Sequence, residues 1–122
     1  MSDDERLNKG KEIFKKVYGD VLSLPEMTEF AKLTLSQLFG EVLARDTMTM
    51  RDRRLLILGA LIGSGADTSL FEIHARAAIG NGEIKPEELE EFCIVLFQYC
   101  GHPRVAPVYA VCRKILKDTK TQ

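Results

Sequence analysis

Two kinds of side chain in this 122-residue sequence could do chemistry, a histidine inside an apolar segment and a group of arginines. The neighbours of His74 at helical spacings of three or four residues are Leu70, Phe71, Ala77 and Ala78. Apolar surroundings lower the pKa of an imidazole and keep it neutral near pH 7. A neutral imidazole can accept a proton and later return it. The alternative interpretation is a core histidine held by a backbone carbonyl.

Three arginines, Arg51, Arg53 and Arg54, crowd the first turn of a predicted helix. Cations are unfavourable at that end of the helix dipole, so an anionic group should meet them. The planar guanidinium suits the carboxylate of a small substrate. The alternative is that the arginines form ordinary surface ion pairs with nearby carboxylates, and each such pair contributes little to stability. Those carboxylates are Glu41, Asp46 and Asp52.

Two glutamates could orient the imidazole or an arginine. Glu41 follows Gly40 near the end of one predicted helix, and Glu72 precedes His74 by two residues. Glu72 is explained more simply as the third helical residue of a capping box that begins at Ser69. Glu41 is therefore the stronger catalytic candidate of the two.

The sequence predicts neither a metal site nor a cofactor. His74 and His102 are the only histidines, and neither has a carboxylate at a ligand-like spacing. The glycines at 63 and 65 end a predicted helix and do not join a strand to one, so no phosphate loop is expected. Cys93, Cys100 and Cys112 form no C-x-x-C motif, so they are predicted to be small buried apolar residues.

The composition favours a soluble, cytoplasmic, single domain over residues 1–122. Seventeen basic residues balance eighteen acidic ones without a basic stripe, so no nucleic-acid partner is expected. The acidic start, Asp3 to Glu5, is unlike a signal peptide. The longest apolar run, residues 55–62, is too short to cross a membrane.

Every periodic segment has helical spacing, and none alternates with period two. The pattern predicts six helices joined by short connections, an all-α bundle. The first covers residues 4–18 and is closed by Gly19, the second begins near Pro25, and the third begins near Thr49 and is buried all round. The last three follow a Ser69-x-x-Glu72 capping box, Pro86 and Pro103, respectively. The apolar side chains on several helices also predict a homo-oligomer.

These features together resemble the carboxymuconolactone decarboxylase family, within the alkylhydroperoxidase D-like superfamily of small all-α proteins. The resemblance covers nearly the whole chain. The matching positions are Arg6-x-x-Lys9-Gly10, Gly40-Glu41-Val42 with Arg45, Arg51 and Arg54, His74 in H-x-R-A, Asn81-Gly82, Pro86-Glu87-Glu88-Leu89 with Glu91, and Tyr99-x-Gly101-x-Pro103.

The resemblance implies a six-helix subunit in a ring-like homohexamer. It also implies cofactor-free decarboxylation of 4-carboxymuconolactone to 3-oxoadipate enol-lactone. His74 would deliver a proton and Glu41 would orient it or an arginine, as the catalytic residues. Arg51, Arg54 and Tyr99 would bind the substrate, with the arginines contacting its carboxylates.

Departures from the family pattern leave the substrate open. The order Leu70-Phe71-Glu72-Ile73 before the histidine is unusual, and the loop at residues 46–50 is one residue longer than usual. The prediction is therefore a lyase acting on a small carboxylated lactone or a related acid. One alternative is a thiol-dependent peroxidase of the same superfamily, although residues 67–70 lack that branch's cysteines. Another is a non-catalytic oligomeric binding protein.

Overall fold

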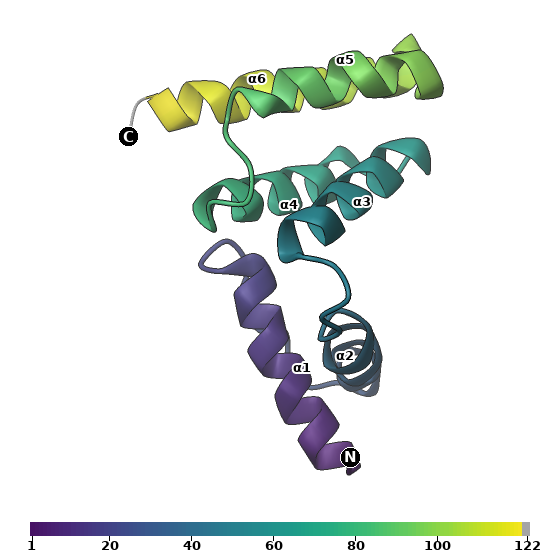
Figure 1. Ribbon diagram of the computed structural model, residues 1–122, viewed down its shortest axis with the longest axis vertical. Helices are drawn as coiled ribbons and strands as arrows, with labels where there is room; N and C mark the ends of the chain where they lie inside the picture. Colours follow the sequence, from purple (N-terminus) through teal and green to yellow (C-terminus); the bar gives the residue numbers. More distant parts are fainter. Residues whose placement is uncertain (121–122) are drawn as a thin grey trace. The chain divides into compact units, whose positions relative to one another are not determined.

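The computed structural model describes residues 1–120, and all regular structure in that part is helical, as predicted (Figure 1). Six helices are present there if the π-helical segment η1 is counted with the helix that it continues, and no strand is present. The chain divides into two compact units, residues 1–49 and the part that begins at Met50. No helix in the described part is both long and apolar enough to span a bilayer.

The first unit contains α1 (Asp3–Tyr18), α2 (Glu29–Thr34) and η1 (Leu35–Val42). Helix α1 ends as predicted, because Gly19 adopts a φ of 55° and donates its N–H to the Lys15 carbonyl. The predicted start of α2 near Pro25 is wrong. The Thr28 hydroxyl instead accepts from the Ala31 N–H at 3.1 Å, and this cap fixes the start at Glu29.

Helix α1 packs closely against η1 at two glycines. Gly10 lies against the backbone of Leu35, and Gly40 lies against the backbone of Arg6. Beside this crossing the rings of Phe14 and Phe39 lie 5.1 Å apart and fill the small core. Only residues without a side chain allow two helix backbones to approach so closely.

Gly10→Ala is expected to destabilise the first unit by about 2 kcal/mol, because the new Cβ would overlap the Leu35 carbonyl group. Urea unfolding followed by circular dichroism measures the change. Gly59→Ala is the matched control, since Gly59 lies inside a helix with no atom near the position of its Cβ. That variant should be about 0.5–1 kcal/mol more stable than wild type. A Gly10→Ala protein as stable as wild type would contradict the close crossing.

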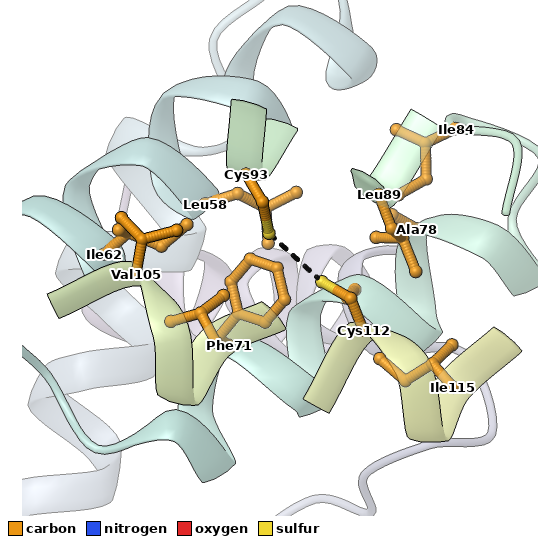
Figure 2. Close-up of a cluster of buried hydrophobic side chains, with 12 residues drawn as sticks. Leu58, Ile62, Phe71, Ala78, Ile84, Leu89, Cys93, Val105, Cys112 and Ile115 are labelled. Atoms are coloured by element: carbon orange, nitrogen blue, oxygen red, sulfur yellow. Dashed lines mark hydrogen bonds between the residues drawn. The ribbon is translucent and has the colours of Figure 1, made fainter. Parts of the chain in front are cut away.

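The second unit contains α3 (Met50–Gly63), α4 (Thr68–Gly80), α5 (Glu88–Cys100) and α6 (His102–Lys120). Helices α3 and α4 pack together, α5 and α6 pack together, and the two pairs form two layers (Figure 1). The core between them is apolar (Figure 2). It consists of Leu58, Ile62, Phe71, Ala75, Ala78, Ile84, Leu89, Cys93, Val105, Val108, Cys112 and Ile115.

Helix α3 is buried on one face, so the prediction that it is buried all round is wrong. Its buried residues are Arg54, Leu58 and Ile62, four residues apart, whereas Leu56 is 61% exposed. Hydrophobic content alone identified the helix but not its buried face.

The predicted capping box at Ser69 is also wrong. Helix α4 begins two residues earlier, at Thr68, because the Asp67 carboxylate accepts from the Ser69 N–H at 2.8 Å. The predicted end at Asn81-Gly82 is confirmed, with Gly82 at a φ of 74°. The next helix, α5, begins at Glu88, two residues after Pro86.

Candidate active site

Arg54 lies on the buried face of α3, one turn from its start, and is 0% exposed. Its guanidinium makes a two-pronged contact with the Glu83 carboxylate, with Nε to Oε1 at 2.7 Å and Nη2 to Oε2 at 3.3 Å. Its Nη1 atom lies 2.9 Å from Nδ1 of His74 on α4. One buried cation therefore joins the two residues and fixes their orientation.

Glu83 reaches Arg54 because the chain turns immediately after α4. The positive φ of Gly82 allows this turn, and Asn81 Nδ2 donates to Glu83 Oε2 at 3.1 Å. The Glu83 side chain is almost fully buried, so its charge needs a partner of opposite sign. The Asn81-Gly82 turn thus places a carboxylate against the buried guanidinium.

The environment of His74 keeps its imidazole neutral. Burial, and then the positive charge of Arg54, lower its pKa from 6.5 to about 4, and the charge of Glu83 only partly opposes them. Because a guanidinium can only donate, Nδ1 of His74 must accept from Arg54. The ring hydrogen is then on Nε2, and at neutral pH the imidazole is a fixed hydrogen-bond donor at that atom.

Arg51 occupies the turn of α3 before Arg54 and is held by α5. Its Nη1 and Nη2 atoms contact the two carboxylate oxygens of Glu88 at 3.2 and 2.9 Å, and Nη1 also donates to the Glu83 carbonyl at 2.6 Å. The hydrogen bonds from Arg51 and from the backbone of Lys85 lower the pKa of Glu88. The Arg51 side chain remains 42% exposed.

An open cavity of about 490 Å³ adjoins this group, and Arg51, Glu83 and Glu88 are among its lining residues. The wall of the cavity therefore carries the positive charge of Arg51 and the negative charge of Glu88. A small carboxylated molecule in this cavity would meet Arg51 directly. Arg54 and His74 are not among the lining residues of this cavity.

Comparison with known proteins identifies the family. Residues 28–114 match the model of the Carboxymuconolactone decarboxylase family, which covers most of the chain and includes residues of both units. The chain belongs to this family. No curated protein and no solved structure matches the chain. The family includes decarboxylases and peroxidases, so membership alone does not select the reaction.

In this family member, the carboxylates bound by the two arginines are Glu83 and Glu88, and the sequence interpretation chose neither. Asp52 adds favourable charge beside Arg51, but it is not the carboxylate that the Arg51 fork binds. The available sequence signal was the glutamate directly after the Asn81-Gly82 turn. That turn returns the chain from α4, which is packed on α3.

The structure brings Arg51, Arg54 and His74 together through Glu83. The other two predicted site residues belong to η1 and to α5. Glu41 lies in η1 of the first unit, where its carboxylate accepts from Arg6 Nε at 2.8 Å. Tyr99 lies on the last turn of α5, 86% exposed and about 16 Å along the helix from Glu88. Their roles in a site stay predictions.

Glu72 forms ion pairs with residues outside the candidate site. Its carboxylate contacts Arg76 at 2.9 Å and Lys114 at 3.2 Å, so it links α4 to α6. Arg76 in turn contacts Asp118 at 2.6 Å. Within the residues that the structure describes, no group of three histidine, cysteine, aspartate or glutamate side chains is arranged to hold a metal ion.

Proposed function

We propose that this protein is a cofactor-free carboxy-lyase that acts on a small carboxylated lactone or a related acid, with 4-carboxymuconolactone as the first candidate. The observation that carries the proposal is the 2.9 Å contact between Arg54 Nη1 and His74 Nδ1. It supplies a neutral, oriented imidazole within a family that includes decarboxylases. The side chain of Arg51, which is 42% exposed, also suits a carboxylated substrate.

Decarboxylation leaves an electron pair that must move into the unsaturated lactone, where negative charge develops on the carbonyl oxygen. A hydrogen bond from His74 Nε2 to that oxygen would stabilise the enolate as it forms. Such a bond strengthens as charge develops, so it favours the transition state over the bound substrate. Arg51 would meet a carboxylate of the substrate in this scheme, because its side chain is 42% exposed whereas that of Arg54 is fully buried.

The pKa of His74 changes its predicted role. With a pKa of about 4, roughly a thousandth of the imidazole is protonated at pH 7, so imidazolium is a scarce proton donor. We therefore assign His74 to enolate stabilisation, with water protonating the carbon. Arg54 and Glu83 are positioning residues in this scheme, since both act through the orientation of the imidazole.

The test is CO2 release from 4-carboxymuconolactone by wild type and His74→Asn. Asparagine places an oxygen near the position of Nδ1, so Arg54 keeps an acceptor while the Nε2 hydrogen is lost. The kcat of the variant should fall by about a hundredfold. His102→Asn is the matched control, because it removes the other histidine at the start of α6, and its kcat should equal that of wild type.

Two outcomes would count against the proposal. Wild-type protein that releases no CO2 would remove the named substrate, and full turnover by His74→Asn would remove the imidazole from the reaction. Glu41→Gln and Tyr99→Phe belong in the same assay, because the roles predicted for those residues require a loss of turnover or an increase in KM.

A further inference from the structure

Two cysteines that are distant in sequence lie side by side in the core of the second unit. Helices α5 and α6 form an antiparallel hairpin, which brings Cys93 Sγ to 3.8 Å from Cys112 Sγ (Figure 2). The sequence analysis found no C-x-x-C motif and did not predict this pair. Both thiols are buried, and Leu58 and Phe71 belong to the same apolar cluster.

The two sulfur atoms differ in access. Cys93 lines a cavity of about 400 Å³ between α5 and α6, whose other lining residues are mostly apolar. Those residues include Ile94, Phe97 and Val105. Cys112 is 0% exposed and does not line this cavity. A small neutral molecule that enters between the helices therefore meets Cys93 first.

The two thiols also differ in acidity. A hydrogen bond from the Cys112 thiol lowers the pKa of Cys93 against the effects of burial and of the Glu90 charge, and the same contact together with burial raises the pKa of Cys112. The thiolate is the nucleophilic form of cysteine. Both position and acidity thus favour Cys93 as the attacking sulfur and Cys112 as the sulfur that resolves the product.

We propose that Cys93 and Cys112 form a reversible dithiol–disulfide pair that is oxidised by a hydroperoxide entering the α5–α6 cavity. This pair lies outside the His74 site, so the inference is independent of the decarboxylase proposal. It adds a modification site to the protein, and the disulfide would join α5 to α6 covalently.

The reaction balances in two steps. The Cys93 thiolate attacks one peroxide oxygen, the O–O bond breaks, and the departing oxygen takes a proton to leave as water or an alcohol. Cys93 is then a sulfenic acid. Cys112 attacks the sulfur of Cys93, the S–O bond breaks, and the oxygen leaves as water with the proton of Cys112. The peroxide is reduced by two electrons, and each sulfur atom supplies one.

The geometry requires a modest adjustment. A disulfide has an S–S distance near 2.05 Å, so the two sulfur atoms must approach by about 1.8 Å. Rotation of the cysteine side chains and a small shift of one helix along the other can supply this.

The experiment treats reduced full-length protein with hydrogen peroxide, then blocks remaining thiols in denaturant and maps the peptides by mass spectrometry. Wild type and the matched control Cys100→Ser should each lose two thiols and yield one peptide pair linking Cys93 to Cys112. Dithiothreitol should restore both thiols. Cys93→Ser and Cys112→Ser should form no disulfide within the chain, and the wild-type map alone decides the matter if these variants fail to fold.

Three results would overturn the proposal. One is retention of all three thiols after peroxide treatment, and another is a disulfide that involves Cys100. The third is a stable oxidised Cys93 beside a free Cys112. The order of attack is tested separately in folded Cys100→Ser by limited alkylation with iodoacetamide. Cys93 should be modified first, and earlier modification of Cys112 would reverse the assigned roles.

Discussion

Replacement of Arg54 by alanine is expected to lower the free energy of unfolding by about 3–5 kcal/mol, as is found when one partner of a buried ion pair is removed. The variant leaves the nearly buried Glu83 carboxylate without its guanidinium and His74 Nδ1 without its donor. It also leaves a cavity on the buried face of α3 where the Arg54 side chain was. Urea unfolding at pH 7, followed by circular dichroism, measures the loss.

The control for this prediction is Arg113→Ala, which removes the same side chain from an exposed position on α6. Its stability should stay within about 0.5 kcal/mol of wild type. Glu83→Gln in the Arg54→Ala background should recover part of the loss, because the uncompensated charge is gone. A loss of stability below about 1 kcal/mol for Arg54→Ala would contradict this prediction. So would additive effects of the substitutions at Arg54 and Glu83, because they would show that the two side chains do not stabilise each other.

The sequence was sufficient to predict the helices and most of their ends. Apolar spacing identifies the helices, and glycine at a positive φ closes α1, α4 and α5 where expected. Helix starts are harder to predict than helix ends, because several capping residues compete over a few positions. Thr28 and Asp67 make the hydrogen bonds that decide the starts of α2 and α4, and each had a plausible competitor in Pro25 or Ser69.

The candidate site was predicted in part. His74 was identified by its apolar neighbours at helical spacing, and Arg54 by the three arginines in the first turn of a predicted helix. Glu83 was missed because it is 29 residues from Arg54 and lies in a turn. Its contact depends on how α3 and α4 pack, and local pattern does not fix that packing. The burial predicted for Cys93 and Cys112 is confirmed, but their pairing depends on the register of α5 against α6.

The buried Arg54 also bears on why the site is built as it is. A buried ion pair seldom makes a protein more stable than well-packed apolar residues would, so its presence calls for another explanation. Here the guanidinium fixes the tautomer and the orientation of an imidazole that has lost its ordinary basicity. Catalytic sites commonly contain groups whose pKa is shifted in this way.

The same pKa shift predicts how stability depends on pH. The pKa of His74 is 6.5 in the unfolded chain and about 4 in the folded protein, so between these values only the unfolded chain binds the extra proton. The contribution of His74 is therefore complete above pH 6.5 and is lost as the pH falls through 4, by about 3 kcal/mol in all. Urea unfolding at a series of pH values between 4 and 7.5 measures the change.

Other carboxylates also titrate at the lower end of this range, so the informative quantity is the difference between wild type and His74→Asn. Asparagine accepts from Arg54 without titrating, and the variant should lack the part of the pH dependence that belongs to His74. The matched control His102→Asn should keep the wild-type dependence. Parallel stability curves for wild type and His74→Asn would mean that the imidazole keeps an ordinary pKa, and the neutral hydrogen-bond donor assigned to His74 would then be wrong.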